Sequence, residues 1–517
     1  MKGGIKEVEC PDSTRTVRGE RGAARPCRVR VRGPRVGGRI VVLGGGITGL
    51  TVAWELSKYS ESPILLIEKN ATAGGLAGSL HHRGRMLDFG SHRIHEQYDP
   101  EVLGVIKELL GDDLLKRPRR GQIRIQGRFL DYPPSPTQVL TSFGFARGAR
   151  LFWDFLIARD HLPLTPRRRG GRNRSESFEE YATGAVGKSL YESFYKPYAL
   201  KLWGVAPASL SFEPAVSRVR KFGARAIWNE AKKRFRGEVG GRYFYYPARG
   251  FGQIAEKIQE QFIENGGEIR FGACVERLEL KNGVEVEAVM VRAGGEELER
   301  IPTEVLISTA PVDALHELVC SALGVNGGEE LGLSWRSLRL LYLFTPDVMP
   351  SEHETYYFPE PDVIFGRVSQ PAKYSPFLCR PAEKNSALVV EIPCAFGDEI
   401  WNMEDEALAG VCVGQLRELK ILSAEPKGQS DHHSRKIKNL YPVYELGWRE
   451  KLGKALRGFN LIENLYPIGR PALFLHCNVD HCMSMALKLA RFLSAGRGSR
   501  RDWERSLGDV FSLSLHD

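Results

Sequence analysis

The pattern of apolar and polar positions is clearest near the start of the chain, in "RIVVLGGGITGLTVAWELSKYSESPILLIEKNATAGG", residues 39–75. Residues 40–43 and 64–67 contain only apolar side chains, as strands buried on both faces of a parallel sheet require. Between them, Ala53 and Leu56 continue a helical spacing that starts at a glycine-rich bend. The pattern therefore predicts a strand–helix–strand unit of an α/β fold.

Similar elements return later in the chain. In order, they are a helix with apolar Ile254, Ile258 and Phe262, strands over 268–271, 275–280 and 284–291, an apolar strand in "EVLISTAP", and a strand, loop and apolar helix in 460–495. Asn282-Gly283 between two of the strands is a strong signal for a β-hairpin. Together they predict a Rossmann-like domain that combines a parallel sheet with a β-meander.

The length of 517 residues predicts more than one domain. We expect a discontinuous nucleotide-binding domain and, inserted into it, a mixed α+β substrate or cap domain. The predicted boundaries are 39–100, 241–311 and 460–495 for the first domain, 101–240 and 312–459 for the second, and 496–517 for a C-terminal tail.

The net charge of +10 is concentrated at the N-terminus. Residues 1–39 hold nine arginines and two lysines against four acids, which accounts for +7 and leaves +3 for the rest. Residues 1–38 lack apolar periodicity, so we expect a disordered basic extension. Because no aromatic residue lies between its arginines, we expect no nucleic-acid partner.

The nine cysteines include no C-x-x-C pair, so we expect reduced thiols, no metal site and no disulfide framework. No run reaches 18 apolar residues, and the sequence predicts a cytoplasmic protein. Eight lysines or arginines in 218–236 indicate a solvated helix face or, as the alternative, peripheral contact with an anionic membrane surface at the inner membrane face.

The glycine-rich bend has the G-x-G-x-x-G spacing of a dinucleotide-binding loop, at Gly44, Gly46 and Gly49. The first glycine permits a tight turn, the second leaves room for a pyrophosphate, and the third allows close helix packing. Glu68 ends the second strand 19 residues later, where a carboxylate can accept hydrogen bonds from an adenosine ribose. We therefore predict a bound dinucleotide.

A second glycine pair, Gly74-Gly75, follows the acid by six and seven positions. This arrangement resembles the amine oxidase and protoporphyrinogen oxidase superfamily of FAD proteins. The resemblance implies that the dinucleotide is FAD, held in an extended conformation along both glycine bends.

Gly469 and Arg470 close a strand near the C-terminus, where an arginine can pair with the pyrophosphate of FAD. A surface salt bridge is the alternative for Arg470. A helix predicted to begin near His481 would direct its positive end at the flavin. Asp480 is either the N-cap of that helix or a cofactor contact, and both roles are compatible.

The run "GRPALFLHCNVDHCMSMA" is similar to the C-terminal flavin motif of a bacterial subgroup resembling UDP-galactopyranose mutase. "LYESFYKPYALKLWGVAPASLS" and "LLKRPRRGQIRIQGRFLDYP" match the same subgroup. The chain departs from it at Ser91 and Ile94, and it has Phe474, His476 and Cys477 where the mutase is rich in tyrosine.

Four residues are predicted to act on the substrate. His92 and Arg93 follow a strand end and a Gly-Ser bend that would approach the flavin, with a structural histidine as the alternative. Lys201 would meet a phosphate or carboxylate, and Trp203 would stack on a ring or lipid, with a buried tryptophan in a helical core as the alternative.

These residues predict an FAD-dependent oxidoreductase that takes two electrons from an unidentified small molecule, anionic or sugar-linked. A flavin-dependent sugar isomerase similar to UDP-galactopyranose mutase is the main alternative. A flavin-binding protein without turnover is the third class.

Overall fold

The computed structural model describes residues 38–132, 138, 177–213, 243–295, 297–325, 330–378, 386–428, 430–496 and 499–507. The predicted basic extension up to residue 37 and the basic run 218–236 lie outside these residues. Within the described part of the chain, no helix is both long and apolar enough to cross a membrane.

The first layer is a five-stranded sheet in which every neighbouring pair is parallel. Its strands, in spatial order, are β10 (Glu268–Phe271), β2 (Ile64–Glu68), β1 (Ile40–Leu43), β14 (Val305–Ser308) and β20 (Leu465–Pro467). All residues of β1 and β2 are buried, as their apolar composition predicts for a sheet covered on both faces. The predicted Rossmann-like α/β fold is confirmed.

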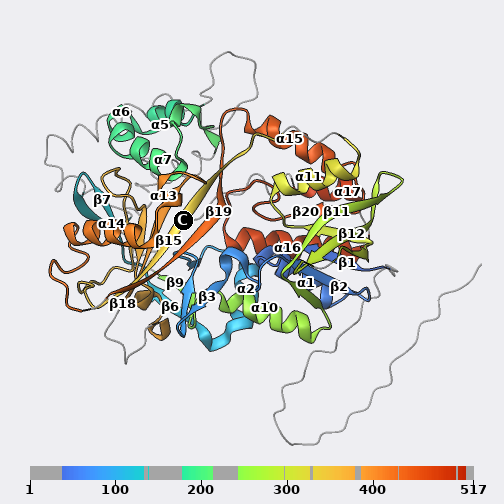
Figure 1. The fold of residues 1–517 in the computed structure, drawn as a ribbon, viewed down its shortest axis with the longest axis horizontal. Helices are drawn as coiled ribbons and strands as arrows, with labels where there is room; N and C mark the ends of the chain where they lie inside the picture. Colours follow the sequence, from blue (N-terminus) through green and yellow to red (C-terminus); the bar gives the residue numbers. More distant parts are fainter. Residues whose placement is uncertain are drawn as a thin grey trace, which may run out of the picture. The chain divides into compact units, whose positions relative to one another are not determined.

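Four helices share one hydrophobic core with this sheet. They are α1 (Ile47–Ser57), α2 (Pro100–Leu110), α10 (Gln253–Glu264) and α16 (Val479–Ala495). The predicted apolar face of α10 supplies Ile254, Ile258 and Phe262, all fully buried. Figure 1 shows the red helix α16 from the end of the chain beside the blue elements from its start. Residues far apart in sequence therefore meet at the glycine-rich bend.

A separate core contains the β-meander and two more helices. The meander is antiparallel, in the order β11 (Ala273–Lys281), β12 (Glu285–Ala293) and β13 (Glu299–Pro302), and the helices are α11 (Val312–Ala322) and α15 (Trp448–Phe459). Asn282 and Gly283 both have positive φ, 54° and 73°, and lie in the short loop between the paired residues Lys281 and Glu285. The predicted hairpin is confirmed.

The second layer is a mixed seven-stranded sheet. Its spatial order is β19 (Asp431–Val443), β15 (Ser334–Thr345), β18 (Ser386–Cys394), β17 (Arg367–Ser369), β16 (Thr355–Tyr357), β7 (Gly121–Ile125) and β8 (Arg128–Tyr132). Alternate residues of β15 enter different cores: Leu341 packs with α14 (Asp405–Glu418), and Tyr342 packs with Leu87. The sheet thus has one face on its own helix and one toward the nucleotide-binding domain.

Shorter elements complete the described chain. The helical segment contains α5 (Phe178–Val186), α6 (Lys188–Leu190), η4 (Tyr191–Tyr195), α7 (Lys196–Trp203) and η5 (Pro207–Ser209). The small sheets are β3 (Ser79–His82) with β4 (Arg85–Asp88), and β5 (Ile94–His95) with β9 (Tyr243–Pro247) and β6 (Leu114–Pro118). The remaining short helices are η1 (Gly75–Ala77), η2 (Gly111–Asp113), α12 (Pro371–Tyr374), η6 (Pro376–Leu378), α13 (Glu399–Asn402) and α17 (Arg500–Leu507).

Core membership differs from the predicted domain boundaries in three places. Helix α2 packs with α10 and α16, although nearly all of its sequence falls in the predicted insertion. Helices α11 and α15 pack against the meander in the same way. In the predicted tail, α17 buries Trp503 against Phe492. Hydrophobic contacts across the chain, which local pattern does not report, place these helices.

Candidate functional site

The two glycine bends lie directly against each other. The amide of Gly74 donates to the carbonyl of Gly45 over 2.7 Å, and Gly46 and Gly74 form a parallel bridge. Gly74 has a φ of 101°, in the region that favours glycine. A Cβ on Gly75 would lie 3.1 Å from Cα of Gly46. The bends therefore form one continuous backbone surface at the start of α1.

The three glycines of G-x-G-x-x-G meet different surroundings. A Cβ on Gly49 would lie 1.9 Å from the carbonyl oxygen of Gly44, and one on Gly44 would lie 2.3 Å from Oγ1 of Thr309. A Cβ on Gly46 would have no atom within 4 Å. Gly46 is also the N-cap of α1 and supplies no capping side chain, so the first amides of the helix are available to a ligand. This open space at a helix N-terminus fits a phosphate.

Glu68 is tied into the first bend. Its buried carboxylate accepts from the amide of Gly45 over 2.6 Å and from the amide of Asn70 over 2.8 Å. A carboxylate has about four acceptor sites, so these bonds leave capacity for ribose hydroxyls. The ribose role of Glu68 stays a prediction, and the structure shows what fixes the orientation of the side chain.

The start of α16 corrects our expectation for Asp480 and His481. The helix begins at Val479, and its N-cap is Asn478, not Asp480. His481 is the third helical residue and completes a capping box, in which its Nδ1 accepts from the amide of Asn478 over 3.3 Å. Asp480 is buried, and its Oδ1 accepts no hydrogen bond from any described residue. Asn and Asp are both common N-cap residues, and Asn478 and Asp480 are two positions apart, so the sequence alone does not show which of them caps the helix.

The Arg470 side chain contacts the protein backbone. Its Nη2 donates to the carbonyl of Leu440 over 2.7 Å and its Nη1 to the carbonyl of Cys477 over 3.3 Å, and the guanidinium lies 4.9 Å from the ring centre of Tyr441. Both terminal nitrogens thus hold protein backbone, and only the buried Nε has no described partner. Since these bonds use two of the five guanidinium N–H groups, the expected pairing with a pyrophosphate stays a prediction. Gly469 before it has a φ of 92°.

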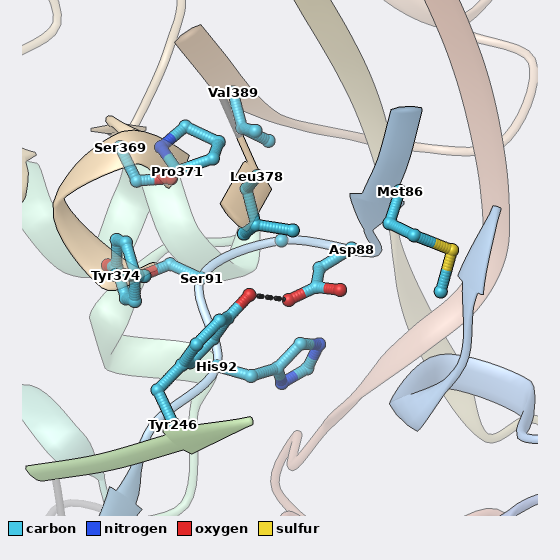
Figure 2. A pocket seen from close by; sticks show the side chains of 11 residues that line it. Met86, Asp88, Ser91, His92, Tyr246, Ser369, Pro371, Tyr374, Leu378 and Val389 are labelled. Atoms are coloured by element: carbon cyan, nitrogen blue, oxygen red, sulfur yellow. Dashed lines mark hydrogen bonds between the residues drawn. The ribbon is translucent and has the colours of Figure 1, made fainter. Parts of the chain in front are cut away.

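The bend after β4 lines a small pocket between the two layers (Figure 2). Its walls are Met86, Asp88, Gly90, Ser91, His92, Tyr246, Ser369, Pro371, Tyr374, Leu378 and Val389. The buried carboxylate of Asp88 accepts from Tyr246 Oη, from Ser79 Oγ over 2.5 Å and from the amide of Phe251 over 2.9 Å. The ring of His92 stacks on Phe251 with 4.7 Å between centres.

Burial shifts the pKa values of Asp88 and His92. Burial raises the pKa of Asp88 above its ordinary value, while the nearby His92 and the hydrogen bonds to the carboxylate act in the opposite direction. Burial lowers the pKa of His92, opposed by Asp88 and Glu391. His92 is therefore a neutral imidazole near pH 7. One ring nitrogen bonds to the backbone of Phe89, and the buried Nε2 has no described partner.

Arg93, which we predicted to act on substrate, instead joins the bend to the second sheet. Its side chain is 7% exposed and pairs with the Glu354 carboxylate, 2% exposed, over 3.0 Å. The same guanidinium donates to the hydroxyls of Tyr357, Thr355 and Tyr374. These partners occupy both terminal nitrogens, so the structure assigns Arg93 a positioning role.

Ser91 is held from the opposite sheet. Its amide donates to Glu391 Oε1 over 2.9 Å, and Glu391 is paired bidentately with Arg367 at 2.8 and 2.5 Å. A side chain on Gly90 would meet this carboxylate at 3.2 Å. The conformation of the bend is therefore set by residues about 300 positions later in the chain.

The side chains of Lys201 and Trp203 contact other parts of the protein. The ammonium of Lys201 donates to the carbonyls of Phe358, Glu360 and Phe365, and burial lowers the pKa of this lysine to about 8. Trp203 is 4% exposed and packs on Phe178 in the core of the helical segment. These contacts correct the expectation that the two residues line a substrate site.

Sequence reasoning missed Asp88, Tyr246 and Glu391. A signal existed for Asp88, an acid that follows Met86-Leu87 and comes two positions before Gly90 of the Gly-Ser bend. Glu391 lies in the apolar strand "ALVVEIP", where a single acid is unusual for a buried strand. Tyr246 is one of several aromatic residues in "YFYYP", and nothing local distinguishes it.

Solved structures of known proteins have the same fold. A crystal structure of reduced UDP-galactopyranose mutase matches with a TM-score of 0.70 at 20% identity, covering 92% of this chain and 100% of that chain. A putative protoporphyrinogen oxidase from Exiguobacterium sp. 255-15 matches at 0.65 and 15% identity, with coverages of 88% and 98%. Putrescine oxidase bound to putrescine matches at 0.55 and 14% identity, with coverages of 89% and 99%.

The family described as flavin containing amine oxidoreductase matches residues 47–435, which is most of the chain. The match includes helix α1, the second glycine bend and the Asp88–His92 pocket, and it confirms the resemblance inferred from Gly74-Gly75. On this evidence the chain belongs to the flavin containing amine oxidoreductase family.

Proposed function

We propose that the protein binds FAD and oxidises a small anionic organic molecule beside the bend that carries Asp88 and His92. The observation that carries the proposal is the open space beside Gly46, at an uncapped helix N-terminus and against the second glycine bend. A dinucleotide with a pyrophosphate fits that cradle, and Glu68 lies where an adenosine ribose would extend. The residues present therefore fit FAD.

In this proposal, FAD supplies the two-electron acceptor, and the protein supplies orientation and proton transfer. A neutral His92 with its other nitrogen bonded to the Phe89 backbone presents a lone pair at Nε2. That atom accepts the proton that leaves the substrate as the substrate is oxidised. Phe251 fixes the ring by stacking, and Asp88 stabilises the imidazolium that forms.

Charge on β19 supports an anionic substrate. Arg435, whose guanidinium lies 5.7 Å from the ring centre of Phe89, has no acidic partner among the described residues. This uncompensated cation close to the bend favours a carboxylate or phosphate group on the substrate.

A sugar isomerase is the second candidate function. The mutase structure covers 92% of this chain with a TM-score of 0.70, above the values of the two oxidases compared above. In a mutase the reduced flavin would act as a nucleophile with no net redox change, so the redox state that supports turnover separates the two candidates.

The first experiment identifies the cofactor and the role of His92. FAD released from the purified protein is identified by chromatography, and anaerobic bleaching of the oxidised flavin is followed with fractionated anionic metabolites. We expect His92→Asn to slow bleaching at least tenfold, while His81→Asn, an exposed histidine on β3, leaves it unchanged. Equal rates in both variants would remove His92 from the mechanism.

The second experiment tests the isomerase. We expect dithionite-reduced enzyme not to interconvert UDP-galactopyranose and UDP-galactofuranose. Interconversion by the reduced enzyme that stops on reoxidation would overturn the oxidoreductase proposal and establish the isomerase.

A further inference from the structure

Two cysteines lie side by side next to the glycine cradle. Cys477 precedes the N-cap of α16, and Cys482 lies in the first turn and a half of that helix. Their sulfur atoms are 3.7 Å apart, and the side chains are buried in the core shared by α1 and α16. The flavin chemistry proposed above uses neither thiol.

The surroundings of the two sulfurs differ. Cys482 lies beside the side chain of Thr48, at the start of α1, and the backbone of Arg470. Cys477 has no comparable set of donors. These surroundings favour Cys482 as the nucleophilic sulfur and Cys477 as its partner thiol.

The pKa values of Cys477 and Cys482 shift in opposite directions. The hydrogen bond from Cys477 lowers the pKa of Cys482, with Thr48 and Arg470 acting in the same direction against burial. The pKa of Cys477 is raised by the same hydrogen bond and by burial. A buried cysteine that only fills space behaves differently: for Cys412, burial raises the pKa to about 12.

We propose that Cys477 and Cys482 form a redox-active dithiol that a hydroperoxide oxidises to a disulfide. The Cys482 thiolate attacks the peroxide oxygen, the O–O bond breaks, and the leaving alkoxide or hydroxide takes a proton to give an alcohol or water. The resulting sulfenic acid is attacked by Cys477, the S–S bond forms, and the hydroxyl leaves with the thiol proton as water. Two electrons pass from the dithiol to the peroxide.

Bond formation requires the sulfurs to close from 3.7 Å to about 2.05 Å. Cys477 lies in the loop between β20 and α16, outside regular structure, so this loop can supply the movement. The disulfide would then connect the loop that carries Arg470 to the helix that faces the glycine cradle.

The test is peptide mapping of the purified full-length protein. The protein is exposed to a small excess of hydrogen peroxide, quenched with iodoacetamide under denaturing conditions and digested with trypsin. Residues 458–488 form a tryptic peptide whose only cysteines are Cys477 and Cys482, because trypsin does not cleave before Pro471. We expect this peptide to carry no alkyl group and to have two hydrogens fewer than its dithiol form. After reduction with dithiothreitol and a second alkylation, it should carry two alkyl groups.

Cys412 is the matched control, since it is equally buried and has no neighbouring thiol among the described residues. It should remain fully alkylated. Full alkylation of both cysteines in peptide 458–488, under conditions that oxidise the more accessible Cys320, would overturn the proposal.

The order of attack is tested with single variants and dimedone, which labels sulfenic acids. After peroxide treatment, Cys477→Ser should carry the label on Cys482, and Cys482→Ser should carry at least tenfold less label on Cys477. Equal labelling would refute the assigned roles. The wild-type mapping does not depend on these variants, so it decides the disulfide even if a variant does not fold.

Discussion

Substitution of Gly46 by valine tests whether the glycine cradle binds the cofactor without supporting the fold. The position has φ −67° and ψ 173°, which any residue adopts, and a Cβ there would have no atom within 4 Å. The loss of glycine at a helix N-cap costs about 1 kcal/mol or less. We therefore expect apo Gly46→Val to melt close to the wild-type apoprotein.

The cofactor response of the two proteins should differ. FAD at 100 times its dissociation constant stabilises a protein that binds only in the folded state by about 2.7 kcal/mol. In Gly46→Val, the side chain occupies the space proposed for the pyrophosphate, so we expect this stabilisation to disappear. The assay is thermal unfolding with and without added FAD, together with the flavin absorbance of the purified protein.

Gly49→Ala is the contrasting variant in the same motif. Its Cβ would lie 1.9 Å from the Gly44 carbonyl oxygen, well under the 3.0 Å that real Cβ contacts essentially never go below. Because backbone must move, we expect the apoprotein itself to lose about 1–3 kcal/mol. A folded Gly46→Val protein that keeps stoichiometric FAD would refute the cradle assignment.

Two further predictions concern the bend after β4. Arg93→Met should lower the free energy of unfolding by about 3–5 kcal/mol because it leaves a buried carboxylate unpaired, whereas Arg83→Met, in an exposed pair with Asp431, should cost less than about 1 kcal/mol. Similar losses in denaturant titrations of both variants would contradict the positioning role. The pKa of His92 is lowered in the folded state. The stability that the buried neutral imidazole contributes is therefore present above the unfolded-state pKa, about 6.5, and is lost as the pH falls below that value. His92→Gln should therefore make unfolding midpoints less sensitive to acid between pH 7 and 5 than His81→Gln does; equal sensitivity would show that His92 is not buried neutral.

The nucleotide-binding unit could be predicted from sequence because its signals are local. Apolar runs with no polar residue, the spacing of Gly44, Gly46 and Gly49, and the Asn282-Gly283 turn each act within a few residues. Backbone sterics and burial on both faces of a parallel sheet leave few alternatives to those patterns. The strands, the first helix and the hairpin are therefore found where the pattern indicates them.

The candidate site was decided by the tertiary structure. Whether Arg93 faces a ligand or a carboxylate depends on Glu354, which lies 261 residues away. The hydrogen bonds of Lys201 depend in the same way on carbonyls more than 150 residues distant. The residues next to an arginine or lysine in the sequence do not show whether its long side chain binds a substrate or another part of the protein.

Burial explains the rest of the difference. Asp88 and His92 acquire shifted pKa values because two layers close over them, and Cys477 and Cys482 become a pair because a loop folds back onto α16. The sequence alone determined that a dinucleotide loop of this family exists. The tertiary structure decided which side chains face this loop. Their protonation states depend on desolvation and on partners that only the folded chain brings together.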